Sequence, residues 1–349
     1  MEKSILRKVE GTAPVGIDVA IPCYQYGHFL RECVYSLVSQ RVPGLRILII
    51  DNASTDNSLE VAQQLAAENP AIEVVAHARN LGPHASFNEA VDWAAQKYFL
   101  LLCADDLSAP GALARAIAVL EQHPEVVLSY GRAALIDADE SVSAETFVGG
   151  AADWRILSGE QLLARFCRSG ICHIAGCTAV VRTETQKQVG YYRPALPHTD
   201  DFELWMRFAL HGAAAETSAT QGIMRDHDAC QSAFVRQQHR WDIQHCGDAF
   251  ESFFAHEGSA LPDARRLLRL ARGCLGARAY WSAISHLSRG DAEEALAIFR
   301  IALKLRPSSV LLPPVYYLFR RQNVWERLAE VLSEVGWSQG SARSERAGA

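Results

Sequence analysis

Four strand patterns, each followed by a helical pattern, constrain the fold of this chain more than any other feature. Short apolar, β-branched runs lie at residues 17–22, 46–50, 72–76 and 98–103. Amphipathic helical spacing follows each run, at residues 26–40, 57–68, 84–96 and 110–123. Strands and helices that alternate in this way form a largely parallel sheet with helices on both faces. We therefore expect an α/β, Rossmann-like domain.

The composition of the 349 residues excludes several classes of protein. A formal net charge of -6 gives no electrostatic reason to expect a nucleic-acid partner. No apolar run approaches the roughly 20 residues of a membrane-spanning helix, and residues 1–16 do not resemble a signal peptide. The nine cysteines are odd in number and scattered, which favours reduced thiols in a cytoplasmic protein.

The first candidate site follows the second predicted strand. An apolar run ends in Asp51, and the chain then turns through small polar residues into a helix that Asp56 can cap. In open α/β sheets, nucleotides bind where the carboxyl end of a strand meets a helix N-terminus. A carboxylate there suits a ribose hydroxyl or a base N–H rather than a phosphate. Asp51 is therefore a candidate nucleoside-binding residue.

The second candidate site is the pair Asp105 and Asp106, which follows the most apolar of the predicted strands. Two adjacent carboxylates at a sheet edge repel each other, so a divalent cation or a basic partner is expected. Hard oxygen ligands suit Mg²⁺ or Mn²⁺. The alternative is that one of the two merely caps the helix that begins near Pro110.

A third acidic group, Asp200, Asp201 and Glu203, lies at the start of a helical pattern at residues 201–211. A carboxylate stabilises a helix N-terminus by about 0.3–1 kcal/mol, which explains one acid but not three. A structural and a catalytic role are both open from these residues alone.

These three sites, in this order, resemble the family 2 glycosyltransferases, which have the GT-A fold that binds nucleotide-diphospho-sugars. The resemblance covers roughly residues 17–232 and rests on the order and spacing of several motifs. The matching motifs are Ala20-Ile-Pro22-Cys-Tyr24, Asp51 to Asp56, Asn80-Leu-Gly82 with Asn88, Ala104-Asp105-Asp106 with Pro110, Asp200-Asp201 with Leu204 and Trp205, and Arg225-Asp-His227 with Ser232.

The resemblance implies an inverting hexosyltransferase of polysaccharide biosynthesis that moves one sugar from a nucleotide sugar, most often UDP-linked, to a glycan, lipid-linked or small-molecule acceptor. It implies a catalytic base at Asp201 with Asp200 as its supporting neighbour. Mn²⁺ or Mg²⁺ would be held by Asp105, Asp106 and His227. The remaining nucleotide-sugar contacts would be Pro22, Tyr24, Asp51, Asn80 and Ala104, with Asp105.

The sequence departs from the family pattern at two positions. Cys103 stands where many members have the first Asp of a DxD motif, and a neutral thiol is a poor ligand for Mg²⁺. Asn52 replaces a frequent second Asp, which keeps an acceptor, loses a charge and is expected to alter the nucleotide preference.

Five further residues are candidates for contact with the donor sugar or the acceptor: His173, Gly176, His198, Trp205 and Trp241. Trp241 ends the segment 237–241, which spells the QxxRW signature of processive synthases. A five-residue pattern with two free positions also arises by chance. A zinc site at Cys167, Cys172, His173 and Cys177 is not expected, because the gaps differ from those of structural zinc sites.

The expected organisation is an N-terminal extension (1–16), a GT-A domain (17–235) and a C-terminal helical region (236–349). Within the last, Gly290, Ala295, Ala302 and Pro307 have the spacing of one tetratricopeptide-type hairpin, at about 276–309. Residues 137–158 are expected to form a mobile loop near a site. The C-terminal helices, including residues 318–337, are candidates for a peripheral membrane contact, a protein contact or simple packing.

Two other functions compete with this interpretation. The first is a non-catalytic protein that binds sugar nucleotides and acts through its helical tail, which Cys103 and the single repeat favour. The second is a nucleotidyltransferase, which the absence of a glycine- and lysine-rich phosphate loop near the N-terminus disfavours.

Overall fold

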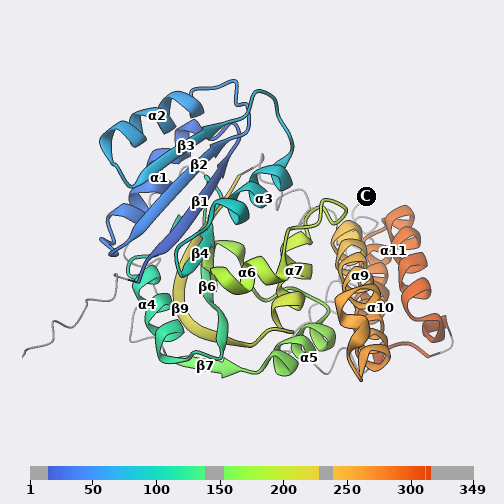
Figure 1. Cartoon of the computed structure of the whole chain (residues 1–349). Coiled ribbons are helices and arrows are strands. Elements are labelled where there is room, and N and C mark those ends of the chain that lie inside the picture. The colour runs from blue at the N-terminus through green and yellow to red at the C-terminus, as the bar shows by residue number, and fades with distance from the viewer. Residues whose placement is uncertain (1–14, 138–152, 228–238, 311, 316–349) are drawn as a thin grey trace, which may run out of the picture. The chain divides into compact units, whose positions relative to one another are not determined.

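The computed structural model describes residues 15–137, 153–227, 239–310 and 312–315. Its contacts divide the chain into two compact units, Met1–Leu268 and Arg269–Ala349. Figure 1 shows the ribbon with the element labels used below. The described elements are β1 (Ile17–Cys23), α1 (Gly27–Val38), β2 (Leu45–Asp51), α2 (Ser58–Glu68), β3 (Ile72–Ala76), α3 (Pro83–Trp93), β4 (Tyr98–Leu101), β5 (Leu107–Ser108), α4 (Ala112–Gln122), β6 (Val126–Asp137), β7 (Trp154–Leu157), α5 (Gly159–Ser169), η2 (Gly176–Thr178), β8 (Val180–Arg182), α6 (Thr183–Val189), α7 (Asp200–Phe208), β9 (Ala213–Asp226), α9 (His239–Ala255), η3 (Glu257–Ala260), α10 (Ala264–Ser288), α11 (Ala292–Leu305) and η4 (Pro307–Val310).

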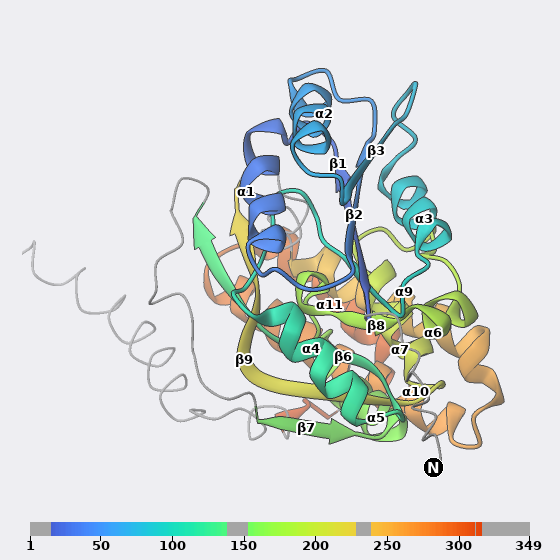
Figure 2. The same ribbon diagram turned by 60° about the vertical axis from the view of Figure 1, so that its left-hand side comes forward.

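The first half of the sheet is parallel, as the alternating pattern predicted. Its strands run in the order β3-β2-β1-β4, and every neighbouring pair among them is parallel. The inward residues of β1 and β2, such as Val19 and Ile49, are fully buried and form the centre of the core. Helices α1 and α2 cover one face of these strands and α3 the other (Figure 2). The carboxyl ends of β1, β2 and β4 therefore meet at one edge of the sheet.

The second half of the sheet is mixed. It continues β8-β6-β9-β5, with β8 antiparallel to both β4 and β6, and β9 parallel to β6. The predicted α/β fold class is confirmed, but parallel pairing is limited to the first half and to the β6–β9 pair. Strand β9 gives no strong strand signal because the segment Ala213–Asp226 consists largely of small and polar residues.

Helix α5 lies outside the helical patterns predicted from the sequence. Its N-cap, Ser158, accepts the N–H of Gln161, and the Gln161 side chain accepts the N–H of Ser158, which is a complete capping box. The Ser-x-x-Gln spacing was a usable signal for this helix. Of the loop expected at residues 137–158, residues 138–152 lie outside the described part of the chain, and β7 occupies Trp154–Leu157.

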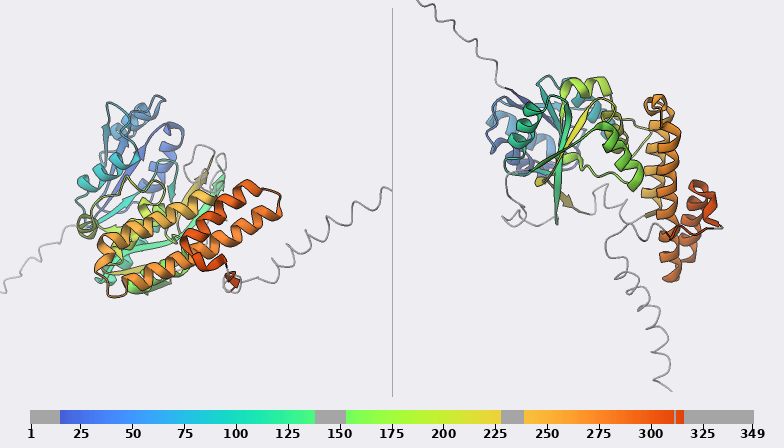
Figure 3. Two further views of the ribbon diagram at one scale, coloured as in Figure 1. Left: turned by 90° about the vertical axis from the view of Figure 1, so that its right-hand side faces the viewer. Right: turned by 90° about the horizontal axis from the view of Figure 1, so that it is seen from below.

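The second unit contains a helical hairpin. Helix α10 turns at Gly290, whose φ of 83° suits glycine, into α11, and the two run side by side (Figure 3). A Cβ at Gly276 would lie 2.7 Å from Cβ of Arg306, so glycine permits this approach of the chain. Ala295 and Ala302 are buried, as a hairpin of this spacing requires. The domain boundary expected near residue 235 lies outside the described residues, and residues 1–14 and 318–337 do as well.

None of the helices in the described ranges is long and apolar enough to cross a membrane.

Candidate active site

The loops after β1 and β2 are joined by a small set of polar contacts. The Gln25 side-chain oxygen accepts the backbone N–H groups of Thr55 and Asp56 at 3.2 and 3.1 Å. The Asp56 carboxylate accepts the N–H groups of Gly27 and Ser58 at 3.2 and 3.0 Å. These are the first residues of α1 and α2. Asp56 thus accepts backbone N–H groups at the N-termini of both α1 and α2, whereas the sequence predicted a cap for α2 alone.

Asp51 ends β2 and is 1% exposed. Its Oδ2 accepts the N–H of Ser54 at 3.2 Å, whereas its Oδ1 is buried and has no hydrogen-bond partner in the described structure. A buried carboxylate oxygen without a donor is costly, so this atom can accept a hydrogen bond from a ligand. Pro22 and Tyr24 lie at the end of the neighbouring strand, in which Cys23 is paired with Asp51, and Tyr24 is 43% exposed.

Asn52 builds the neighbouring loop rather than facing a ligand. Its amide nitrogen donates to Oδ1 of Asn80 at 3.1 Å and to the carbonyl of Gly82 at 3.2 Å. Its oxygen accepts the N–H of Leu81 at 2.9 Å and lies 2.8 Å from Nδ1 of His77. Both ends of the amide are occupied and the residue is 4% exposed. Asn52 and Asn80 therefore hold the loop between β3 and α3 in place, and an effect of Asn52 on nucleotide preference has to act through this loop.

Asp105 and His227 meet at the carboxyl edge of the sheet. Oδ2 of Asp105, which follows β4, lies 3.1 Å from Nε2 of His227, which follows β9. The rings of Tyr26 and Phe29 flank the His227 imidazole at centroid separations of 5.3 and 5.4 Å. The adjacent Ala104 is fully buried in the core. Two aromatic neighbours and a carboxylate thus orient one imidazole toward Asp105.

Asp106 is turned toward β9. Its Oδ1 lies 3.4 Å from the backbone nitrogen of Arg225, and the Arg225 side chain forms an ion pair with Glu32 at 2.7 Å. Burial, with the neighbouring Asp105 carboxylate, raises the pKa of Asp106 well above its usual range. Burial likewise raises the pKa of the Cys103 thiol, which is therefore protonated at neutral pH and no ligand for a hard cation. Within the described ranges, no three His, Cys, Asp or Glu side chains gather as a ready-made metal site.

Asp200 and Asp201 begin helix α7 and have different environments. Oδ2 of Asp200 lies 3.2 Å from Nε2 of His84, in the first turn of α3. Oδ1 of Asp201 accepts the N–H of Phe202 at 2.6 Å. Burial, reinforced by the Asp200 carboxylate, raises the pKa of Asp201 to about 7. Asp201 therefore has the proton affinity that suits a general base at neutral pH.

Asn88 and Tyr192 connect α7 to the rest of the site. The Asn88 side chain accepts the N–H of Tyr192 at 2.8 Å and donates to its carbonyl at 3.2 Å, which holds the segment before α7 on α3. Burial raises the pKa of the Tyr192 hydroxyl, and the Asp200 and Asp201 carboxylates and Cys103 add to this effect. Tyr192 therefore lies near both the end of β4 and the start of α7.

Glu203, the third acid of this group, has a structural role. It is fully buried and forms ion pairs with Arg207 at 2.9 Å and with Arg193 at 2.6 Å. Arg207 also donates to the backbone carbonyls of Val189 and Tyr191. Of the three acidic residues at the start of α7, Asp200 and Asp201 therefore lie at the candidate site, whereas Glu203 lies in the core.

The five predicted substrate contacts differ in their surroundings. Nε2 of His173 lies 2.8 Å from the Ser169 hydroxyl, and Gly176 begins η2 with open space where a Cβ would lie. His198 is exposed, has a φ of 70°, and lies edge-on to His245 with ring centroids 5.8 Å apart.

The two tryptophans differ from each other as well. Trp241 is 36% exposed and stacks on His245 at 5.7 Å. Trp205 is 3% exposed and packs against Phe208, and its buried indole Nε1 has no hydrogen-bond partner in the described structure, so its contact with a sugar stays a prediction. In the QxxRW segment, Gln237 lies outside the described residues, whereas Arg240 and Trp241 lie on α9.

Two histidines near the acidic pair were not identified from the sequence. His84 lies beside Asp200, and His245 lies beside His198, both from helices that are distant in the chain. The hydroxyl of Thr199 donates to the backbone carbonyl of His245 at 3.1 Å, which fixes α9 to the start of α7. No local pattern in one sequence marks such contacts, because they depend on how α3, α7 and α9 pack.

Comparison with known proteins identifies the family and the fold of this chain. Residues 18–190 match the family described as Glycosyl transferase family 2. An uncharacterized glycosyltransferase of Escherichia coli (strain K12), YibD, is 37% identical over 90 residues, which are 26% of this chain and 26% of YibD. The chain thus spans about a quarter of that relative's length. A chondroitin synthase of Pasteurella multocida is 27% identical over 146 residues, which are 42% of this chain and 14% of the synthase.

Two solved structures share the fold. S. aureus TarS 1–349, in complex with UDP-GlcNAc, superposes with a TM-score of 0.53 at 15% identity over 82% of this chain and 90% of TarS. The mannosyltransferase PcManGT of Pyrobaculum calidifontis, in complex with GDP-Man and Mn²⁺, gives a TM-score of 0.53 at 16% identity over 84% and 88% of the two chains. Through residues 18–190 this chain belongs to glycosyl transferase family 2, and it has the GT-A fold.

Proposed function

We propose that this chain transfers a single hexose from a nucleotide-diphospho-sugar to a hydroxyl of a glycan, lipid-linked or small-molecule acceptor, with inversion at the anomeric carbon. The observation that carries the proposal is Asp201, a carboxylate whose pKa is raised to about 7 at the helix start next to the strand ends. Family membership and the fold supply the reaction class. UDP is the expected nucleotide, and it is the one that TarS binds.

Asp201 is the proposed general base. It takes the proton from the acceptor hydroxyl while that oxygen forms a bond to the anomeric carbon. The bond between this carbon and the diphosphate oxygen breaks, and the nucleoside diphosphate leaves with the electron pair. Attack from the face opposite the leaving group inverts the configuration. Asp200, paired with His84, keeps Asp201 in a negative field that strengthens its proton affinity.

Asp51 is the proposed contact for the nucleoside. Its Oδ1 is a buried acceptor that lacks a donor in the described structure, and a ribose hydroxyl or a base N–H would satisfy it. Pro22 and Tyr24 lie at the adjacent strand end, and Tyr24 has enough exposed ring to pack on a base. The loop that Asn52 and Asn80 hold closes the same edge of the sheet.

Asp105 and His227 fit a divalent metal ion. Neighbouring ligands of an octahedral ion at about 2.1 Å lie about 3 Å apart, and the Asp105 and His227 donor atoms are separated by 3.1 Å. A carboxylate oxygen and an imidazole nitrogen both suit Mn²⁺, and Asp106 is the adjacent further candidate. Such an ion, when bound, neutralises the charge that grows on the departing diphosphate. The solved structure of PcManGT is a complex with GDP-Man and Mn²⁺.

Donor binding tests the proposal. The purified chain is titrated with UDP-, GDP- and TDP-sugars in the presence of Mn²⁺, with and without chelator, and heat release and nucleotide release are measured. We expect one nucleotide class to bind in a metal-dependent manner. If no nucleotide sugar binds, the proposal is wrong, and a role as a binding protein for sugar nucleotides fails with it.

A further inference from the structure

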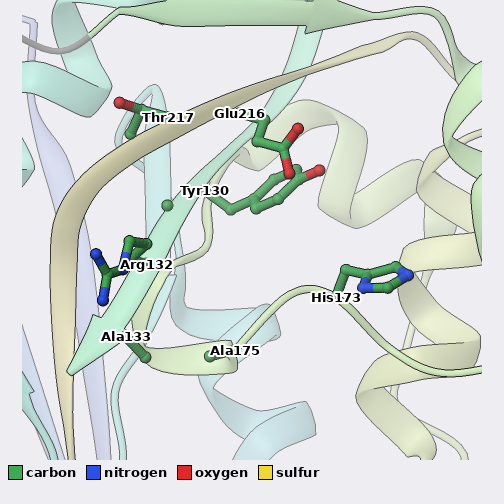
Figure 4. Close-up of a pocket in the computed structure, with 8 residues that line it drawn as sticks. Tyr130, Arg132, Ala133, His173, Ala175, Glu216 and Thr217 are labelled. Carbon is green, nitrogen blue, oxygen red and sulfur yellow. The ribbon is translucent and has the colours of Figure 1, made fainter. Parts of the chain in front are cut away.

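A cavity of about 210 Å³ opens beside β6 and β9, and the nucleotide and metal residues described above take no part in it. Its polar lining comes from Tyr130 and Arg132 on β6, Glu216 and Thr217 on β9, and His173 in the loop that precedes η2. Figure 4 shows the hydroxyl of Tyr130 beside the carboxylate of Glu216. The cavity therefore combines side chains from two paired strands and from a loop.

An irregularity in the strand pair shapes this cavity. Tyr130 is paired with Glu216, but Arg132 is paired with Thr220, so residues 217–219 have no partner on β6. A Cβ at Gly131 would lie 2.5 Å from Cγ of Gln221, so glycine lets the strands approach here. Bulges of this kind bend a strand and redirect its side chains, and they are frequent next to active sites.

The cavity lies close to the proposed base. His173 follows Cys172, whose thiol has a pKa that burial raises and that the Asp201 carboxylate raises further. The His173 ring stacks on Phe166 at a centroid separation of 6.3 Å, and Phe166 packs edge-on against Phe202, the residue after Asp201, at 5.2 Å. Aromatic packing thus connects His173 of the cavity to the start of α7, where the proposed base lies.

The polar groups of the cavity leave hydrogen-bonding capacity for a ligand. Tyr130 is 2% exposed, and its hydroxyl has no hydrogen bond of ordinary geometry in the described structure. Such a buried hydroxyl is costly, and a ligand hydroxyl would satisfy it. Glu216 uses one oxygen in its ion pair with Arg165 and retains acceptor capacity on the other.

The interior of the cavity favours an uncharged ligand. The carboxylate of Glu216 is compensated by Arg165, so this pair carries little net charge. Arg132 also lines the cavity, but it is exposed and its side chain extends away from Tyr130 and His173 (Figure 4). Burial and the nearby Arg165 lower the pKa of His173, which is therefore neutral at pH 7. A pocket for a drug-sized ligand has roughly 300–1,000 Å³, so this smaller cavity suits one ring of a longer molecule.

We propose that this cavity binds a neutral sugar residue of the acceptor, with Tyr130 and Glu216 as the residues that recognise its hydroxyl groups. The assignment rests on the proposed glycosyl transfer, because an acceptor must reach Asp201. It makes the strand irregularity of β9 a determinant of acceptor specificity.

Sugar binding to the full chain tests this proposal. Methyl glycosides of glucose, galactose, mannose and N-acetylglucosamine are titrated by saturation-transfer NMR, with and without excess UDP and Mn²⁺. We expect at least one glycoside to bind, and to remain bound in excess UDP. Glu216→Gln should weaken that binding by about tenfold or more, and Tyr130→Phe by about threefold to tenfold, since hydrogen bonds to charged groups are the stronger ones.

Matched controls separate recognition from folding. Tyr130→Phe removes a hydroxyl that makes no hydrogen bond of ordinary geometry, and Glu216→Gln keeps an acceptor oxygen for Arg165, so both variants should fold. Glu184→Gln and Tyr35→Phe, at exposed positions, should bind like the wild type. Absence of binding by the whole panel, displacement of the glycoside by UDP, or equal binding by Glu216→Gln would each overturn the proposal. Donor binding, measured separately by calorimetry, tests the proposed transfer function. A failure of the acceptor-cavity proposal is therefore distinguishable from a failure of the proposed transfer function.

Discussion

Nε2 of His84 lies 3.2 Å from Oδ2 of Asp200, and this contact joins the helix that follows the donor-side loop to the helix that carries the proposed base. Helix α3 begins directly after Gly82, whose carbonyl accepts a hydrogen bond from Asn52. A chain of contacts therefore runs from the end of β2 to the start of α7. Changes at the proposed nucleoside edge can thus alter the position of the base.

The pH dependence of transfer follows from the environment of Asp201. Its pKa is raised to about 7, and a general base acts in its ionised form. We expect kcat to be low at acidic pH, to rise through a midpoint near 7 and to level off above it. Transfer is measured at saturating donor and acceptor from about pH 5 to about pH 9. A kcat that stays level down to about pH 5, as a base with the ordinary aspartate value of 3.8 would give, would contradict the assigned environment.

Asn52→Asp should destabilise the donor side, although it restores the residue that many family members have. The substitution replaces the nitrogen that donates to Asn80 and Gly82 by an oxygen, which places three acceptors together. Leaving buried acceptors without donors costs roughly 1–3 kcal/mol. We expect a lower Tm and weaker nucleotide binding. An unchanged Tm would show that the loop repacks around the carboxylate.

Asp56→Ala should destabilise the fold, because Asp56 accepts N–H groups at the start of both α1 and α2. One such cap is worth about 0.5–2 kcal/mol, so we expect the loss of two to lower the free energy of unfolding by about 1–4 kcal/mol. Asp56→Asn keeps an acceptor oxygen and should lose less.

The same residue gives a pH signature. Hydrogen bonds from Ser58 and Gly27 lower the pKa of Asp56 below the ordinary aspartate value of 3.8 despite partial burial. The stabilisation is therefore present above that value and is lost as the pH falls through the lowered pKa. Urea unfolding should separate wild type and Asp56→Ala at neutral pH and bring them together in strong acid. A gap that persists in strong acid would contradict the ionic character of the cap.

Metal dependence should reside in Asp105 and His227. Chelation is expected to abolish transfer and restored Mn²⁺ to recover it. His227→Ala should raise the Mn²⁺ concentration for half-maximal activity by at least about tenfold, whereas His211→Ala, at an exposed position, should leave it unchanged. Full activity of the wild type in excess chelator would exclude a metal at this pair.

The parallel half of the fold was predictable because its strands are continuous apolar runs and its helices are amphipathic. Residues such as Ile47 and Ile49 are buried as the pattern indicates. Strand β9 was not predictable in this way, since its segment is held by pairing with β5, β6 and β7 rather than by its own propensity. Because neighbouring strands stabilise β9 from both sides, its own sequence needs no alternating apolar pattern, and a single sequence does not reveal the strand.

The site was predictable where one residue at a strand end carries the chemistry. Asp51, Asp105 and Asp201 lie at the strand and helix ends that the patterns indicated. His84, which contacts Asp200, was not predictable, because it reaches α7 from α3 through packing of distant elements. Tyr130 and Glu216 line the cavity beside β6 and β9, and no local pattern brings them together either. The burial of Trp205 was not predictable either, because its motif does not indicate how deeply the ring lies.

The most direct test of the account compares wild type with Asp201→Asn and with the control Asp153→Asn, an exposed position. For each protein, the affinity for the preferred nucleotide sugar is measured by calorimetry, and transfer is measured with an acceptor that the wild type uses. We predict that Asp201→Asn binds the donor like the wild type and transfers about 10²–10⁴-fold more slowly, while Asp153→Asn is unaffected. Transfer by Asp201→Asn at the wild-type rate would contradict the central claim that Asp201 takes the proton.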